Sequence, residues 1–225
     1  IRQAVASVMR KMGQQFVLGQ TIQKAICRAK KYEAKSYTYS YDMLGEAAMT
    51  DIDAKAYHMS YADAITEIAK AAASEDIRKN PGISIKLSAL HPRYDFLHRE
   101  QVLQDLAPRA RTLALLAKSA GIGLNIDAEE AARLDLSLDV IGFLLSEPAL
   151  AGWDGFGVVV QAYGKRASFV IEWLYQLAQK FDRRIMVRLV KGAYWDSEIK
   201  QAQVENLSGF PVYGAKHNTD ISYIC

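Results

Sequence analysis

The chain contains five short apolar runs, each followed by a polar or charged residue, and this repeat limits the folds it can adopt. The runs and the residues that follow them are Tyr39-Ser40-Tyr41 before Asp42, Ile83-Ser84-Ile85 before Lys86, residues 122–126 before Asp127, residues 158–160 before Gln161, and residues 185–187 before Arg188. Segments of helical periodicity separate the runs, so the pattern predicts alternating strands and helices. Functional side chains of parallel α/β proteins gather at the carboxyl ends of strands. We therefore expect the residues after these runs to mark a site.

Two parallel architectures fit this alternation. An open, doubly wound sheet usually carries a glycine-rich phosphate loop after its first strand, but the chain reads Leu44-Gly45-Glu46-Ala47-Ala48 there and lacks the G-x-G-x-x-G spacing. A polar residue also follows every run, rather than only the runs at one switch point. We favour an α/β fold of the TIM-like (β/α)₈ barrel type. A complete barrel takes about 250 residues, so the chain supplies about the first five strand-helix units.

Composition narrows the class of protein further. The chain has 225 residues, half of them hydrophobic, with a net charge of +3, which suits one globular core. The short basic segment at residues 28–31 is typical of a solvated helix end, so we expect no nucleic-acid contact. No apolar stretch approaches the roughly 18 residues of a membrane span. Ile1 enters an amphipathic pattern directly, without a signal peptide, and residues 223–225 stop within a new apolar face, so we expect a segment of a longer chain.

Several reaction classes lose support from the residues that are present. Cys27 and Cys225 suggest neither a metal site nor a disulfide framework, which indicates a reducing compartment. The histidines lack metal-ligand spacing. There is no G-x-S-x-G nucleophile elbow. Metalloenzyme and hydrolase functions are therefore disfavoured, and no metal site is expected.

Local patterns predict individual helices. Val5, Val8, Met9, Met12 and Phe16 indicate one or two helices over residues 1–31. Thr50-Asp51-Ile52-Asp53 resembles a capping box before a helix whose apolar face holds Tyr57, Tyr61, Ile65 and Ile68. A later helix ends near residue 120, and Pro108 is expected to kink or divide it. The last short helix is expected to begin near Tyr194.

The residues after the runs suggest several kinds of chemistry. Lys86 could bind a carboxylate or phosphate, form a Schiff base, or make a structural ion pair with Asp127 or Asp42. Asp127 is expected to point into the site. Gln161 can both donate and accept hydrogen bonds, which suits a flat heterocycle.

The segment from Arg188 to Trp195 combines two cations, Arg188 and Lys191, with Gly192 and two aromatic residues. Gly192 would allow backbone amides to approach a ligand, and the following helix N-terminus favours anions. Tyr194 and Trp195 could pack on a planar ring.

Long motifs resemble one known family. In the order of that family, the chain reads Tyr39-Ser40-Tyr41-Asp42-Met43-Leu44-Gly45-Glu46-Ala47-Ala48, Ser84-Ile85-Lys86-Leu87-Ser88-Ala89-Leu90-His91-Pro92-Arg93-Tyr94, Asn125-Ile126-Asp127-Ala128-Glu129-Glu130, Gln161-Ala162-Tyr163 and Arg188-Leu189-Val190-Lys191-Gly192-Ala193-Tyr194-Trp195-Asp196. These segments closely resemble the proline dehydrogenase domain of bacterial proline utilization A, over essentially the whole chain. The resemblance implies a flavin-dependent barrel that oxidises L-proline to Δ1-pyrroline-5-carboxylate by hydride transfer to N5 of FAD and passes the electrons to a membrane quinone.

The resemblance also implies roles for individual residues. Asp127 and Arg188 would be the catalytic pair, with Arg188 near flavin N5 and the role of Asp127, as base or as positioning group, left open. Lys86, Leu189 and Tyr194 would bind proline. Residues implied to contact FAD are Ile126, Gln161, Arg188, Val190, Lys191, Gly192, Ala193, Trp195 and Lys216.

Further implications concern the rest of the polypeptide. The family's later strands, a flavin-contacting histidine and a carboxylate-binding arginine pair lie outside this sequence, and Gly214-Ala215-Lys216 stands where relatives carry Thr-Arg-Lys. We expect lead-in helices over residues 1–34 and a partial barrel over residues 35–225. The resemblance implies a fused aldehyde dehydrogenase domain, in some members a DNA-binding domain, self-association into a homo-oligomer, and a cytoplasmic location with peripheral attachment to the inner membrane. The alternatives are a Schiff-base barrel that uses Lys86 or Lys191 and an inactive structural part of a larger chain.

Overall fold

The computed structural model describes residues 17–35, 37–43, 45 and 47–225, together with Val5, Met9, Met12 and Gly13. Of the helix face expected near the start, Val8 and Phe16 lie outside the described residues. The side chains of Val5, Met9 and Met12 are exposed. The first helix that can be placed is α2 (Ile22–Glu33), which ends in the expected basic segment.

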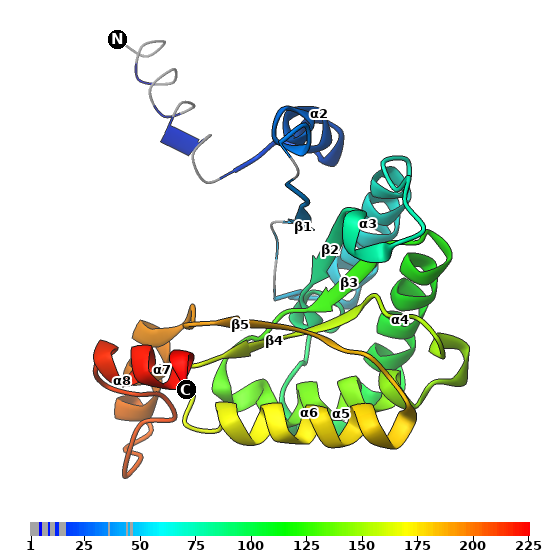
Figure 1. Cartoon of the computed structure of the whole chain (residues 1–225). Helices are drawn as coiled ribbons and strands as arrows, with labels where there is room; N and C mark the ends of the chain where they lie inside the picture. Colours follow the sequence, from blue (N-terminus) through cyan, green and yellow to red (C-terminus); the bar gives the residue numbers. More distant parts are fainter. Residues whose placement is uncertain are drawn as a thin grey trace.

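A five-stranded parallel sheet forms the centre of the fold (Figure 1). Its strands are β1 (Ser40–Asp42), β2 (Gly82–Ile85), β3 (Gly123–Ile126), β4 (Phe156–Gln161) and β5 (Met186–Val190). Their order in the sheet is the same as their order in the sequence. A doubly wound sheet reverses its strand order at a switch point, and no reversal occurs among these strands. The consecutive order is that of a partial TIM-like barrel, as the sequence predicted.

Helices join the successive strands and cover one side of the curved sheet (Figure 1). The connecting helices are α3 (Asp51–Ala69), α4 (Arg99–Ser119), α5 (Leu134–Ser146) and α6 (Ala167–Phe181); α7 (Trp195–Val204) and α8 (Lys216–Ile224) follow β5. Short 3₁₀ turns occur at Ile77–Lys79, Leu87–Ala89, Phe96–His98, Ala131–Arg133 and Pro148–Leu150. This arrangement leaves the other side of the sheet, the barrel interior, for polar side chains.

The hydrophobic core lies between the sheet and helices α3–α6. Alternate strand residues point into it, because successive side chains of a strand face opposite sides. They include Ile83, Ile85, Leu124, Ile126, Val158 and Val160. Ser84, Lys86, Asn125 and Asp127 therefore lie on the opposite, inner face.

The local predictions had mixed outcomes. The capping box is confirmed: Asp53 N donates to Thr50 Oγ1 at 3.1 Å, and Thr50 N donates to Asp53 Oδ2 at 2.9 Å. Pro108 does not divide its helix, since α4 continues through it. The strand β5 runs beyond the expected residues 185–187, because Leu189 and Val190 continue the pairing with β4. Arg188 therefore lies within a strand rather than after it.

Candidate active site

The strand register aligns charged side chains at the carboxyl ends of the strands. Asp42 pairs in register with Ser84, and Ser84 pairs with Asn125. Ile85 pairs with Ile126, and Ile126 pairs with Val158, so the residues that follow them, Lys86, Asp127 and Val159, lie at one level. Val159 pairs with Arg188, which places Arg188 at this level too. Because parallel neighbours in register face the same side, the strands bring these side chains together on the inner face.

Asp42, Lys86, Asp127 and Arg188 form a continuous chain of ion pairs, here called the charged chain. Lys86 Nζ lies 3.0 Å from both carboxylate oxygens of Asp42 and 2.9 Å from Asp127 Oδ2. Arg188 Nη2 donates to Asp127 Oδ1 at 2.6 Å. The charges alternate in sign, so the group is neutral as a whole. The ion pairs that the sequence allowed between Lys86 and either acid are thus both present.

Lys86 is held as an ammonium ion. Burial lowers the pKa of Lys86, but the hydrogen bonds and charges of Asp127 and then Asp42 outweigh this effect, and the net result is a raised pKa. Tyr61, from α3, accepts a hydrogen bond from Lys86 N at 3.1 Å and fixes the backbone at this position. Burial, as the largest cause, raises the pKa of Tyr61 to about 12, so its hydroxyl stays neutral.

Ser84, Asn125 and Gly157 form a polar layer beneath the charged chain. Arg188 Nη2 donates to Ser84 Oγ at 3.0 Å, and Ser40 Oγ lies 3.2 Å from Ser84 Oγ. A Cβ on Gly157 would lie 1.9 Å from Asn125 Oδ1, so only glycine leaves room for that amide. This layer was not predicted from the sequence. The sequence feature that indicates it is a polar residue, Ser84 or Asn125, two positions before Lys86 or Asp127 in an otherwise apolar strand.

Gln161 bridges the loops that follow β3 and β5. Its Nε2 donates to Glu129 O at 3.0 Å, and its Oε1 accepts from Ala193 N at 3.0 Å. The Gln161 side chain is also hydrogen-bonded to Tyr163. Its carbonyl oxygen has a second lone pair, so Gln161 can still accept a hydrogen bond from a ligand while it holds the loop after β5.

Gly192 is required by packing as well as by backbone conformation. Its φ is +138°, and a Cβ there would lie 2.5 Å from the ring of Tyr163. Tyr163 Oη in turn accepts from Tyr194 N at 3.3 Å. The first turn of α7 holds its own acids, Asp196 and Glu198, so the positive end of this helix already has negative neighbours. The glycine therefore serves the fold of the loop, which the sequence analysis did not anticipate.

Lys191 and Lys216 both form ion pairs with Asp220. Lys191 Nζ lies 2.5 Å from Asp220 Oδ1 and Lys216 Nζ lies 2.6 Å from Asp220 Oδ2. Their hydrogen bonds, with that of Lys191 the larger cause, lower the pKa of Asp220 to about 2. Nearby, Trp195 is partly exposed and its Nε1 donates to Tyr213 O at 2.9 Å. The structure thus joins candidates from β5, α7 and α8 at one end of the sheet.

Two of the residues singled out in the sequence face away from the charged chain. Leu189 is level with Val160 and packs against the core. Ile126 is fully buried in that core. Val190, by contrast, is level with Gln161 and shares the inner face. A ligand on the inner face would therefore meet the main chain of Ile126 rather than its side chain.

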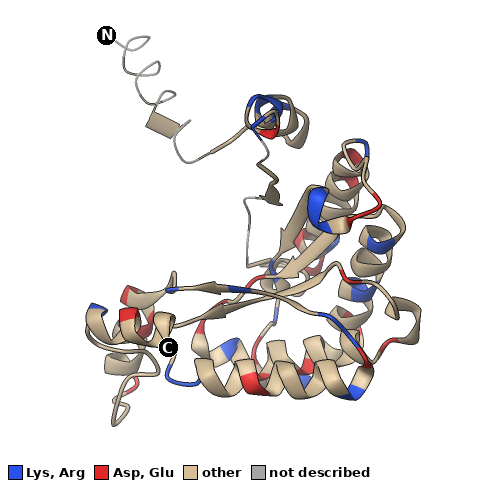
Figure 2. Ribbon diagram, viewed as in Figure 1, with Lys and Arg blue, Asp and Glu red and all other residues tan. Residues whose placement is uncertain are grey.

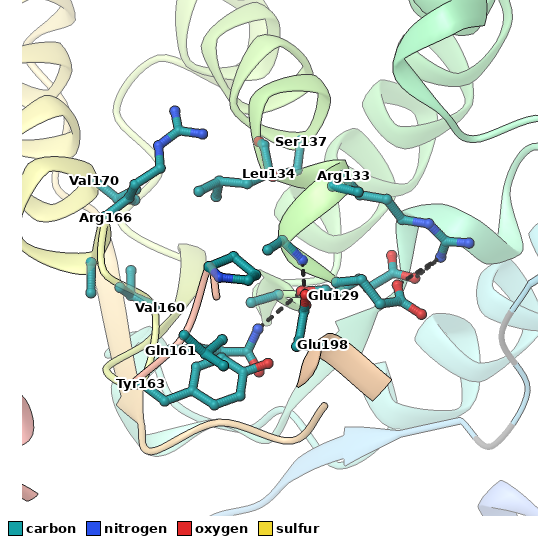
Figure 3. Close-up of a pocket in the computed structure, with 18 of the residues that line it drawn as sticks. Glu129, Arg133, Leu134, Ser137, Val160, Gln161, Tyr163, Arg166, Val170 and Glu198 are labelled. Atoms are coloured by element: carbon teal, nitrogen blue, oxygen red, sulfur yellow. Dashed lines mark hydrogen bonds and ion pairs between the residues drawn. The ribbon is translucent and has the colours of Figure 1, made fainter. Parts of the chain in front are cut away.

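A cavity of about 640 Å³ lies behind this site, between α5, α6 and α7 (Figure 3). Its apolar walls include Leu134, Ile141 and Val170, and its polar wall contains Glu129 and Glu198. Burial raises the pKa of both acids, although Ser88 and Arg133 oppose this for Glu129. Asp127 and Gln161 also line the cavity, whereas Lys86 and Arg188 do not, so the cavity borders the charged chain at Asp127.

Within the described ranges, no cluster of three or more His, Cys, Asp or Glu side chains could hold a metal ion. None of the helices placed in the structure is long and apolar enough to cross a bilayer. Burial lowers the pKa of His58, which sits within α3. Figure 2 shows Lys and Arg interspersed with Asp and Glu along the ribbon.

The fold and the charged chain define an α/β barrel domain with a site at the carboxyl ends of its strands. The family described as Proline dehydrogenase matches residues 25–225, and the chain belongs to this family.

Similar proteins agree with this assignment. The bifunctional protein PutA of Klebsiella aerogenes is 57% identical over 224 residues, which cover 100% of this chain and 17% of the relative. A crystal structure of Bradyrhizobium japonicum Proline Utilization A is 51% identical with a TM-score of 0.88, over 99% of this chain and 23% of that one. The PutA of Bdellovibrio bacteriovorus, inactivated by N-propargylglycine, is 28% identical with a TM-score of 0.91, over 98% of this chain and 24% of that one. The chain therefore spans about a fifth of the length of these proteins.

Proposed function

We propose that this chain forms part of an FAD-dependent enzyme that oxidises L-proline to Δ1-pyrroline-5-carboxylate and passes the electrons to a membrane quinone. The observation that carries the proposal is the charged chain at the carboxyl ends of β1, β2, β3 and β5. It supplies a fixed ammonium for the carboxylate of an amino acid and a fixed guanidinium beside it. Membership of the proline dehydrogenase family supports the choice of substrate.

Lys86 is proposed to bind the proline carboxylate. Its ammonium is mostly buried and held between two acids, so it is positioned before the substrate arrives. A preorganised charge loses little entropy when it binds a ligand. Tyr194, at the start of α7, is proposed to pack on the proline ring.

Asp127 and Arg188 are proposed to act as one unit. Both oxygens of Asp127 accept from a cation, Oδ2 from Lys86 and Oδ1 from Arg188. This geometry favours a positioning role for Asp127 over that of a general base. Arg188 Nη2 also donates to Ser84, so two hydrogen bonds hold its guanidinium, and it would favour negative charge that develops nearby.

The residues around β5 fit a flavin. Gln161 keeps a second lone pair on Oε1 for a ring edge, Trp195 offers an exposed aromatic face, and Lys191 and Lys216 supply positive charge for phosphates. The main chains of Ile126, Val190, Gly192 and Ala193 border this region. When bound, FAD would supply the acceptor for the hydride from the ring carbon beside nitrogen. The protein's own task is to hold the amino acid in one orientation and to place positive charge where electrons arrive.

The Schiff-base alternative is disfavoured by the protonation of both candidate lysines. A lysine nucleophile needs a lowered pKa. The pKa of Lys86 is raised by its acids despite burial, and the hydrogen bond to Asp220 raises that of Lys191. Borohydride trapping with a carbonyl compound should therefore give no covalent adduct.

The remaining proposals concern the complete polypeptide. We propose that residues 1–34 lead into a barrel that begins at residue 35. Because the Klebsiella relative is described as bifunctional, we also propose that this barrel is fused to an aldehyde dehydrogenase domain. We also propose a cytoplasmic enzyme that self-associates and meets the inner membrane surface when it reduces quinone.

The test is an anaerobic titration of the complete FAD-loaded enzyme with L-proline, followed by flavin absorbance. We expect proline to bleach the oxidised flavin and D-proline to have little effect. An oxidised spectrum that persists at saturating L-proline would contradict the proposal. A purified chain of these residues that binds no flavin would instead support the alternative of a structural part that is inactive by itself.

A further inference from the structure

All hydrogen-bond donors of the Lys86 ammonium are already used. An ammonium group has three N–H donors. Lys86 Nζ lies within 3.0 Å of three carboxylate oxygens, two from Asp42 and one from Asp127. A substrate carboxylate can therefore reach Lys86 only if one of these acids withdraws.

Burial and bonding decide which acid withdraws more easily. The side chain of Asp42 is 47% exposed, whereas that of Asp127 is 11% exposed. Asp127 is also held by Arg188 at 2.6 Å, while Lys86 is the one ion-pair partner of Asp42 among the described residues. Releasing Asp127 from Lys86 would leave a mostly buried carboxylate oxygen without its cation and would require movement against the ion pair with Arg188, which is costly. Releasing Asp42 breaks one partly exposed pair, which costs little.

The position of Asp42 also suits its release. It is the last residue of β1, and a rotation of its side chain would leave the backbone pairing of β1 with β2 intact. The same geometry leaves Lys86 bound to Asp127 after Asp42 has moved.

We propose that Asp42 is an exchangeable counter-ion, which occupies the carboxylate-binding position of Lys86 in the free enzyme and is displaced by the carboxylate of the substrate. This inference rests on the proposed function, because it requires that Lys86 binds that carboxylate. Asp42 acts through Lys86 and is a positioning residue. The exchange keeps two carboxylates on Lys86 before and after binding, so the charge of the site changes little around the reacting group.

The exchange makes a prediction opposite to that of a purely supporting role. If Asp42 competes with the substrate, its neutralisation should strengthen carboxylate binding. If Asp42 only holds Lys86 in place, its neutralisation should weaken binding, because Lys86 would become less ordered.

The experiment measures the dissociation constant of cyclopentanecarboxylate for the complete FAD-loaded enzyme by titration calorimetry. This probe carries a ring and a carboxylate but no amine, so it cannot be oxidised as proline is. We expect Asp42→Asn and Asp42→Ala to bind it about two- to fivefold more tightly than wild type, the range for loss of a partly exposed ion pair. Asp63→Asn, an exposed acid on α3, makes the same change in net charge and should bind like wild type.

Equal or weaker binding by both Asp42 variants, with their melting temperatures unchanged, would overturn the exchange. A third variant separates this outcome from failure of the proposed function. Lys86→Met should weaken binding of cyclopentanecarboxylate about 30-fold or more. If wild type and Lys86→Met bind the probe alike, Lys86 is not the carboxylate site, and both the exchange and the proposed role of Lys86 fail. If only the Asp42 result fails, the proposed function stands.

Discussion

The ion pair between Asp127 and Arg188 spans three strands. Asp127 follows β3 and Arg188 lies in β5, yet Arg188 Nη2 is 2.6 Å from Asp127 Oδ1. Val159 of β4 lies between them at the same level. Because Arg188 is long enough to reach over this valine, one guanidinium joins strands that share no backbone hydrogen bonds. The pair therefore ties β5 to the end of β3 across β4 at the site.

Replacing Arg188 by Lys tests this geometry. The guanidinium donates from one nitrogen to both Asp127 and Ser84, and the shorter, non-planar lysine cannot reproduce this arrangement. We expect flavin reduction at saturating proline to slow about tenfold or more, which corresponds to about 1.4 kcal/mol in the barrier. The flavin potential should also become more negative, since positive charge moves away. Anaerobic stopped-flow absorbance and a redox titration measure the two effects.

Arg184→Lys is the matched control. Arg184 lies just before the same strand, is exposed, and pairs with Asp154 at the surface. Its replacement by lysine should leave both the rate and the potential unchanged. Equal rates in the two variants would show that the shape of the Arg188 side chain is unimportant.

Replacing Lys86 by Met should mainly weaken proline binding. The variant removes the ammonium between Asp42 and Asp127, and loss of one partner from a buried charge pair costs about 2–5 kcal/mol. We therefore expect the KM for proline to rise about 30-fold or more. Steady-state kinetics with Lys55→Met as a control will measure this, since Lys55 is an exposed residue of α3. A KM that stays within twofold of wild type would argue against Lys86 as the carboxylate site.

The sequence predicted the strand-end residues well for a physical reason. Lys86, Asp127 and Gln161 each follow or end an apolar run, and an apolar strand in a parallel sheet is buried up to its last residue. A polar residue at that position must lie at the strand end. The strand containing Arg188 was predicted too short, because a charged residue such as Arg188 indicates the end of an apolar strand. Leu189 and Val190 continue the apolar strand beyond it.

The polar layer beneath these residues could not be predicted in the same way. Ser84 and Asn125 lie within strands, and their contacts depend on how β1, β2 and β3 are aligned. Strand register is a long-range property that no single run contains. The cavity between α5, α6 and α7 likewise depends on how helices from three units pack, so no single run of residues predicts it.

Gly157→Ala tests the polar layer. The added Cβ would lie 1.9 Å from Asn125 Oδ1, so the amide must move. Overpacking of this kind costs about 1–3 kcal/mol, and we expect urea denaturation to show a loss of stability in this range. Gly209→Ala is the control, because nothing lies near its Cβ position.

A second variant shows whether the clash is specific. Asn125→Ala combined with Gly157→Ala should be less destabilised than the sum of the two single variants predicts, because the clashing group is gone. Strict additivity would mean that Asn125 and Gly157 do not interact as the structure indicates.

Glu198 should make stability depend on pH. It lies in the first turn of α7, is buried, and accepts a hydrogen bond from Ala131 N at 2.6 Å. Burial is the largest cause of its raised pKa, which the hydrogen bond from Ala131 opposes. The folded state therefore holds this proton more tightly than the unfolded state, and the resulting stability is lost as pH rises from the ordinary value of 4.5 through the raised pKa.

Glu198→Gln removes this titration and keeps the acceptor oxygen. Relative to wild type, the variant should gain stability as pH rises from about 4 and reach a constant difference above the raised pKa. Urea denaturation between about pH 4 and pH 8 measures the difference. Glu205→Gln is the matched control, since Glu205 follows the same helix and is exposed, and its difference from wild type should vary less with pH. If the difference in unfolding free energy between Glu198→Gln and wild type stays constant over this pH range, Glu198 has the same pKa in the folded and unfolded states. Burial would then not destabilise its charged form.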